Sequence, residues 1–201
     1  MYALKGCVGT LFEIRRRVMK VQEVVLTAAM ELGIADAVRA YLDEGNETGK
    51  KQLELLLECF NLVENELALD YLPLRAEDTV DSASGKISYL MLRYAPVRVI
   101  KVTDEWDNST AFSIFPDYLS TQPGRVKISY TYTPEKKQMT DKSDFEMQVS
   151  VRLMAYGVAA EYALATGLFE EAAIWDKKYK EAIKATYTAQ PCRRIASRRW
   201  V

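Results

Sequence analysis

The hydrophobic period changes twice along this chain of 201 residues, and that change is what most constrains its fold. From 125 to 133 the pattern is a strict alternation, with Val126, Ile128, Tyr130 and Tyr132 on one face, which is typical of a strand. Helical spacing precedes and follows this stretch. The first helical stripe has intervals of three and four residues, at Leu11, Ile14, Val18, Val21, Val25, Ala28 and Leu32.

The first helical block is expected to end at Pro73 and to contain two further helices. Ile34 to Leu42 predicts a short helix, which a polar turn over 43–49 ends. A long helix is predicted from Lys50 to Leu72, with Thr48 as its N-cap. Its expected core face comprises Leu53, Leu56, Leu57, Phe60, Val63 and Leu67.

The central block predicts a small antiparallel sheet within 86–133. The polar stretch Arg75 to Lys86 is typical of a loop, and so is 117–124. Strands are expected over 96–103, 110–115 and 125–133, with a short piece near 87–92. We expect the flanking helices to cover one face of this sheet.

The last helical block, 143–188, predicts a hairpin of two helices joined at Gly167. Ser143 followed by Glu146 has the spacing of a capping box, which would start the first of these helices. Its expected inner residues are Met147, Val151, Met154, Val158 and Tyr162, and those of the second helix are Leu168, Ala172, Trp175, Tyr179 and Ile183.

These blocks predict an α+β fold that is mostly α. A helical bundle carries a small antiparallel sheet inserted between its N-terminal helices (19–74) and its C-terminal hairpin, as one domain over 19–190. Residues 1–18 are a candidate extension, because Met19 offers a better-formed start and Arg15-Arg16 is what a purine-rich ribosome-binding site would encode. Arg15 to Arg17 are otherwise expected to form a solvated helix face.

The composition disfavours an enzyme. The chain has no His, which removes Ser–His and Cys–His pairs and His-based zinc sites. Its three cysteines, Cys7, Cys59 and Cys192, lack metal-ligand spacing and are expected to be reduced thiols. No Gly-rich phosphate loop, signal peptide or membrane-spanning apolar run is present in the sequence. We therefore predict no catalytic residue, no cofactor, no metal and no membrane partner.

Carboxylates on the long helix are also expected to lack a chemical role. Glu58, Glu64 and Glu66 do not share a face at the i, i+3 or i+4 spacing that a metal site on a helix needs. Because Glu is usually exposed, we expect all three on a solvated face.

The C-terminal segment 191–201 has the most unusual composition. It contains four Arg and no acidic residue, whereas the whole chain has a net charge of −1, so the body is mildly acidic. Trp200 makes a merely solubilising tail less favoured, because Arg and Trp are enriched in interface hot spots. We predict an interaction arm with the contact residues Arg193, Arg194, Ile195, Arg198, Arg199 and Trp200.

Two further aromatic residues are candidate contacts with a neighbouring copy or with a tail component. Trp106 lies in a polar turn, where local packing is an equally good interpretation. Tyr118 follows Phe115-Pro116-Asp117, and an ordered turn that packs Tyr and Phe under the sheet is favoured over a binding loop.

The order of elements resembles the head-to-tail connector (neck adaptor) proteins of tailed bacteriophages and prophages. The resemblance covers about residues 19–201. It rests on the residue composition and order of several segments: Asn61–Ala68, Phe115–Leu119, Val126–Tyr130, Arg152–Ala163 and Trp175–Tyr179.

The resemblance implies a structural virion protein that forms a ring, usually a dodecamer, beneath the portal. It implies a host-cytoplasmic location during assembly and no cofactor. Its partners would be the portal protein through the arm, neighbouring copies, a downstream neck or tail protein, and viral DNA that passes the lumen without specific binding. An alternative from the residues alone is a small nucleic-acid-binding accessory protein that uses the Arg-rich tail.

Overall fold

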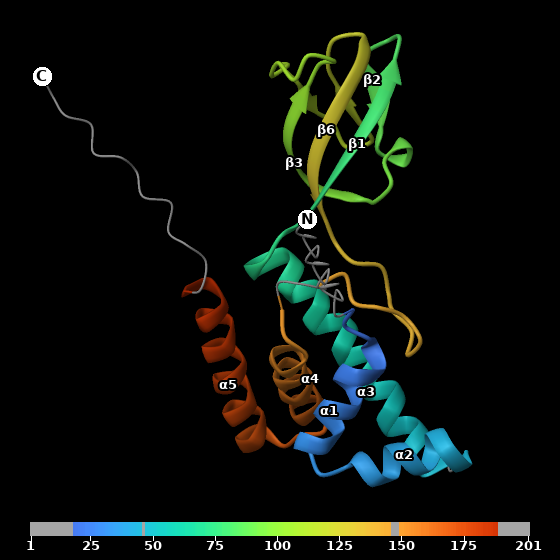
Figure 1. Cartoon of the computed structure of the whole chain (residues 1–201), viewed down its shortest axis with the longest axis vertical. Coiled ribbons are helices and arrows are strands. Elements are labelled where there is room, and N and C mark those ends of the chain that lie inside the picture. The colour runs from blue at the N-terminus through green and yellow to red at the C-terminus, as the bar shows by residue number, and fades with distance from the viewer. Residues whose placement is uncertain (1–17, 46, 146–148, 189–201) are drawn as a thin grey trace, which may run out of the picture.

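The computed structural model describes residues 18–45, 47–145 and 149–188, and within them a helical region lies below a β module (Figure 1). The helical region comprises the described residues within 18–72 and 133–188, and the β module comprises 73–132. The α+β class is therefore as expected. The helices are α1 (Val21–Glu31), α2 (Ala35–Glu44), α3 (Glu47–Glu66), which continues as the π-helix η1 (Leu67–Tyr71), α4 (Val151–Ala165) and α5 (Phe169–Thr188).

Helix α4 is the centre of the helical region, because it packs on α1, α3 and α5. Its small residues make this possible, and Gly157 makes the closest approach. A Cβ built at Gly157 would lie 2.7 Å from Cγ1 of Val63 on α3 and 3.0 Å from Cε2 of Tyr179 on α5. The predicted hairpin of α4 and α5 is confirmed, and Gly167 between them has a φ of 79°, which favours glycine.

The β module contains two three-stranded antiparallel sheets. In the first, the strand order is β1 (Leu74–Ser82), β6 (Gly124–Tyr132) and β3 (Pro96–Thr103). In the second, it is β2 (Lys86–Ser88), β5 (Tyr118–Ser120) and β4 (Ser113–Ile114), beside the short 3-10 helix η2 (Tyr89–Met91). The predicted strand over 96–103 is confirmed at both ends, and the inward face of β6 is also as predicted for Val126, Ile128 and Tyr130, which are buried.

The β module has a core of its own, so the expectation that helices cover the sheet is wrong. The residues of this core come from both sheets and from the segment after η2: Val80, Ile87, Leu92, Val99, Val102, Leu119, Val126, Ile128 and Tyr130. A separate core fills the helical region. The second sheet covers the inner face of the first. The sequence did not predict this second sheet, because it indicated fewer strand residues in this part of the chain.

Three segments of the β module differ from their predictions. The expected loop over 75–86 contains β1, which pairs with β6 along its whole length, from Leu74 opposite Tyr132 to Ser82 opposite Gly124. The expected loop over 117–124 contains β5. The expected strand over 110–115 is reduced to the two residues of β4, because Thr110 instead donates its backbone N–H to Val102 O.

Two predicted helix starts are wrong. Helix α3 begins at Glu47, one residue before the predicted cap Thr48, so the turn before it is shorter than expected. Helix α4 begins at Val151 and not near Ser143: its N-cap is Ser150, whose Oγ accepts from the N–H of Leu153 at 3.2 Å. The proposed partner Glu146 lies outside the described residues.

The segment that leaves the β module, 133–145, is held on α3 by side-chain hydrogen bonds. Asn61 accepts from the N–H of Lys137 at 2.6 Å and donates to Lys137 O at 3.3 Å. Nζ of Lys137 also forms an ion pair with Asp144 at 2.8 Å. The same segment pairs with the start of α1: Lys20, just before the helix, forms an isolated bridge with Lys142, and the N–H of Val21 donates to Asp141 O. The insertion is therefore tied to the helices at its exit.

Candidate interaction surfaces

The predicted arm lies outside the described residues. Arg193, Arg194, Ile195, Arg198, Arg199 and Trp200 all follow Thr188, where α5 ends. Leu11, Ile14 and Arg15 to Arg17, and the cysteines at 7 and 192, also lie outside the described residues. The contacts predicted for the arm therefore stay predictions.

Trp106 is 78 % exposed on the turn that follows β3. Asp104 shapes this turn, because Oδ1 of Asp104 accepts from the N–H groups of Trp106 at 2.9 Å and of Asn108 at 2.8 Å. Hydrogen bonds, chiefly from the Asn108 side chain, lower the pKa of Asp104. Asp107 completes the turn with a φ of 60°. The Trp106 backbone is thus fixed while its indole faces solvent, as a contact residue requires.

Tyr118 lies on β5 and belongs to a different group. Its ring stacks on that of Phe115, with 4.7 Å between the centroids, and Nζ of Lys86 lies 5.4 Å from its centroid. Tyr118 is half-buried and Phe115 is exposed, so the two rings pack on each other at the surface. The favoured expectation, that they pack under the sheet, is wrong, because Leu119 occupies the core.

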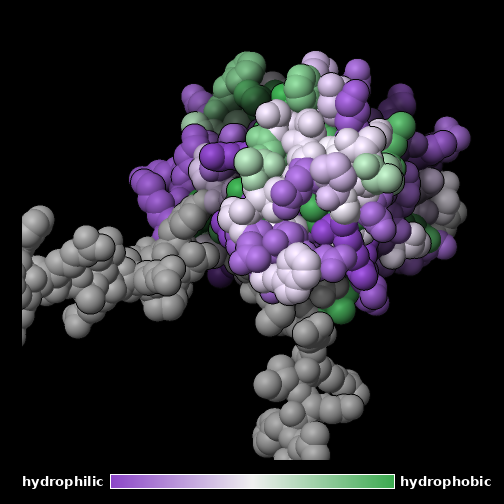
Figure 2. All heavy atoms as spheres, turned by 90° about the horizontal axis from the view of Figure 1, so that it is seen from above, coloured by the Kyte–Doolittle hydropathy of each residue, from purple (hydrophilic) through white to green (hydrophobic). Residues whose placement is uncertain are grey.

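Exposed apolar residues on the β module form separate patches. Figure 2 shows hydrophobic residues scattered among hydrophilic ones on the face seen from above. Leu90 and Met91 of η2 are exposed, and η2 is joined to the β4–β5 turn because the Tyr89 hydroxyl donates to Phe115 O at 2.8 Å. Ile114, the last residue of β4 before that turn, is exposed.

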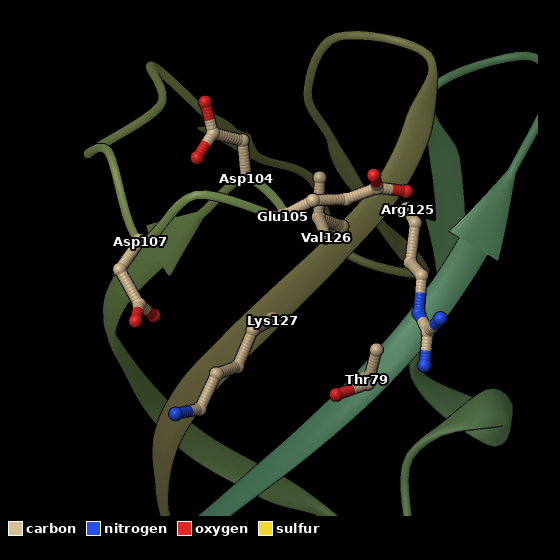
Figure 3. Close-up of a pocket in the computed structure, with 7 residues that line it drawn as sticks. All are labelled: Thr79, Asp104, Glu105, Asp107, Arg125, Val126 and Lys127. Atoms are coloured by element: carbon tan, nitrogen blue, oxygen red, sulfur yellow. The ribbon is translucent and has the colours of Figure 1, made fainter.

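A polar hollow of about 390 Å³ lies where β1, β6 and the turn after β3 meet (Figure 3). The turn contributes three acidic side chains, while Arg125 and Lys127 project from β6. Lys127 is already paired with Glu77, at 2.8 Å, and this hydrogen bond raises the Lys127 pKa. Charges of both signs line the hollow, and several of them already have partners nearby. We therefore do not assign a ligand to it.

One flank of the α4–α5 hairpin carries a basic–aromatic face, which we define as Arg152, Tyr156, Ile174, Trp175 and Lys178. The rings of Tyr156 and Trp175 stack with 5.7 Å between centroids. Lys178 Nζ lies 3.9 Å from the Trp175 centroid, and Arg152 lies 5.3 Å from that of Tyr156. Both cations are exposed, and Ile174 beside them is 57 % exposed. These cation–π contacts hold two positive charges over a flat aromatic surface.

The other flank carries an acidic face, which we define as Glu58, Leu62, Glu66 and Glu161. On α3, Leu62 is 59 % exposed and is flanked one turn away on each side by Glu58 and Glu66. Burial, followed by repulsion from Glu161 on α4, raises the pKa of Glu66. Glu66 also accepts from the Tyr179 hydroxyl at 3.4 Å, so α5 borders this face.

The expectation that Glu58, Glu64 and Glu66 are all solvated is therefore wrong in part. Glu58 is exposed and Glu66 is half-buried, but Glu64 is only 1 % exposed. Its Oε1 accepts from Ser143 Oγ at 2.6 Å and from the Asp144 N–H at 3.0 Å, and these bonds replace water. Burial raises the Glu64 pKa despite them. Glu64 thus anchors the 133–145 segment.

Sequence reasoning did not find the basic–aromatic face. It placed Trp175 on an inner stripe, whereas the structure leaves this ring half-buried at the edge of the hairpin. A signal was present: Arg152 and Tyr156 are one helical turn apart, and so are Trp175 and Lys178. The sequence does not reveal that these turns of α4 and α5 pack against each other in the hairpin.

Within the described residues, no group of three or more Cys, Asp or Glu side chains is arranged to hold a metal ion. None of the described helices combines the length and the apolar character that crossing a membrane requires. Comparison of the chain with models of known protein families gives no matching family, and comparison with curated proteins gives no match.

Proposed function

We propose that this chain is a structural protein of the neck of a tailed bacteriophage or prophage. In this proposal it forms a ring that joins the portal of the capsid to the tail and leaves a channel for DNA. It acts in the virion, after assembly in the cytoplasm of the host bacterium. It is not an enzyme, and it uses surfaces instead of a reactive centre.

One observation carries the proposal: a β module with its own core is inserted between α3 and α4 of a helical region that ends in the α4–α5 hairpin. The resemblance to neck adaptor proteins implies this order of elements. The arginine-rich segment 191–201 begins three residues after α5 ends, so the hairpin is the anchor from which an arm would leave the ring.

The charge distribution supports the same role. The body without the arm is mildly acidic, so a ring of such bodies would not bind the passing phosphates strongly. The arm carries four Arg and suits an acidic or aromatic surface on the portal. Each arm makes a small contact, but a ring engages many arms at once, so avidity makes the attachment durable.

The test is assembly of the purified chain with the portal protein from the same phage genome, observed by negative-stain electron microscopy. A ring on the portal is expected for the full chain, and deletion of 191–201 should abolish docking while the far-UV circular dichroism stays unchanged. Trp200→Ala should weaken docking, whereas Phe169→Ala, at an exposed aromatic ring to which no contact is assigned, is the matched control and should not.

The same experiment distinguishes the alternative. If the chain ignores the portal but binds DNA with an affinity that falls steeply with salt, and deletion of 191–201 abolishes this binding, the protein is a nucleic-acid-binding accessory protein. Unfolding on deletion of 191–201 would instead show that the segment belongs to the core and that the arm is misassigned.

A further inference from the structure

We infer that neighbouring copies of this chain contact one another head to tail, with the basic–aromatic face of one copy on the acidic face of the next. This inference rests on the proposed function in one respect: a ring requires a contact between copies. It goes further by assigning that contact to the two flanks of the α4–α5 hairpin.

The first argument is that the two faces project in opposite directions. On α4, Arg152 and Glu161 are separated by about two and a half helical turns, so they lie on opposite sides of the helix. On α5, Trp175 and Lys178 lie on one flank, whereas Asp176 and Lys180 lie on the other, where Lys180 pairs with Asp176 at 2.7 Å. A contact between such faces leaves one face of each copy free for a further copy.

The second argument is charge complementarity. The basic–aromatic face presents the exposed cations Arg152 and Lys178. The acidic face brings Glu58, Glu66 and Glu161 together, and burial followed by repulsion from Glu161 raises the pKa of Glu66. Cations from another copy would relieve this repulsion. Because each face repels its own kind, the pairing of unlike faces is selected.

The third argument is that each face has an apolar centre among its charges. Leu62 is exposed between Glu58 and Glu66, and Ile174 is exposed beside Trp175 and Lys178. An apolar centre with a charged rim is the usual anatomy of a protein interface, and a half-buried Trp is a frequent hot spot within it. The partner of each face is therefore the surface of a folded protein. A second copy of this chain has such a surface, with an apolar centre and charges of the opposite sign.

The experiment uses charge reversal on the full chain, with sedimentation velocity as the measurement. Arg152→Glu with Lys178→Glu reverses one face, and Glu58→Lys with Glu161→Lys reverses the other. Each reversal alone should weaken self-association by about tenfold or more, because attraction becomes repulsion. An equimolar mixture of the two reversed proteins should regain association, because unlike faces meet again. Lys101→Glu, an exposed charge on β3, is the control and should change nothing.

Circular dichroism of each variant separates a lost contact from a lost fold, and recovery in the mixture excludes misfolding. The inference is overturned if the wild type stays monomeric both alone and on the portal, or if the reversals leave association unchanged. A normal ring on the portal from either reversed protein would overturn the inference and leave the proposed function intact. Self-association that follows these rules without portal binding would instead keep the inference and remove the function.

Discussion

The glycine at the centre of the helical region offers the sharpest test of its packing. Gly157 lies in the middle of α4, where alanine is favoured over glycine by about 1 kcal/mol of helix propensity. In an exposed helix, Gly157→Ala would therefore stabilise the protein. Here the added Cβ would lie 2.7 Å from Cγ1 of Val63 and 3.0 and 3.2 Å from two ring carbons of Tyr179.

The steric term is expected to exceed the propensity gain. Val63 is fully buried and Tyr179 is 3 % exposed, so neither side chain has solvent to move into. Overpacking a core by one methyl group costs about 1–3 kcal/mol. After the propensity gain of about 1 kcal/mol is subtracted, Gly157→Ala should lower the free energy of unfolding by up to roughly 2 kcal/mol, and it should not stabilise the protein.

Urea unfolding at 25 °C, followed by far-UV circular dichroism, measures this change. Gly49→Ala is the comparison, because its Cβ would lie 2.1 Å from the backbone O of Ala37, and backbone yields less than a side chain. Gly49→Ala should therefore lose more than Gly157→Ala. Adding Val63→Ala to Gly157→Ala should cost less than the sum of the single changes. A Gly157→Ala protein that is about 1 kcal/mol more stable than the wild type, as helix propensity alone predicts, would refute the close approach of the three helices.

Three other predictions concern the segment tied to α3 and the buried thiol. Asn61→Ala leaves the partly buried backbone groups of Lys137 without the Asn61 side chain and should lower the free energy of unfolding by about 1–3 kcal/mol in the same urea assay. The pKa of Glu64 is raised in the folded state, so its contribution to stability is present below the usual value of 4.5 and is lost as the pH rises through the folded pKa. The stability of Glu64→Gln relative to the wild type should therefore increase with pH between pH 4 and pH 8, and a flat difference in urea titrations would contradict this. Burial raises the pKa of Cys59 to about 11, so in a variant whose two other cysteines are serine, Ellman's reagent at pH 8 should label Cys59 only after unfolding.

The sequence was sufficient for strands with strong alternation and insufficient for β1. Strand β3 was predicted at both ends because Val and Ile dominate it. In β1 the inward positions include Ala76, Asp78 and Ser82, which carry little hydrophobic signal. Asp78 tolerates its position because Oδ2 accepts from the Tyr130 hydroxyl at 2.6 Å. This partner lies 52 residues away in the chain, where a local pattern cannot reveal it.

The predicted start of α4 is wrong for a related reason. Ser143 and Ser150 are both acceptable N-caps on local grounds. The choice is made by Glu64, whose buried carboxylate binds Ser143 and the N–H of Asp144. That contact holds Ser143 in the segment before the helix. The burial of Glu64 depends in turn on this same segment, so a local pattern predicted a solvated Glu64. The burial of Glu64 and the start of α4 therefore cannot be predicted independently of each other.

Of the candidate surfaces, the arm and Trp106 are predicted from composition and local context, whereas the hairpin faces are not. Composition alone singles out 191–201, because four Arg without an acidic residue is a local property. The basic–aromatic and acidic faces combine residues of two helices each, and their opposite charges largely offset one another in a sum over the chain. Segregation of charge in space is therefore visible only after α3, α4 and α5 are packed.

That segregation also bears on the symmetry of assembly. A twofold dimer brings the same face of two copies together, so the basic–aromatic face would meet Arg152 and Lys178 with their own counterparts, and like charges would repel. A twofold pairing of unlike faces is excluded as well, because the two faces of one copy lie on opposite flanks of the hairpin and one partner does not reach both. Head-to-tail repetition satisfies every face but leaves the outermost two unpaired in an open chain. If copies associate as we infer, closure into a ring would pair these as well, so the same charges would favour the closed assembly over a linear one.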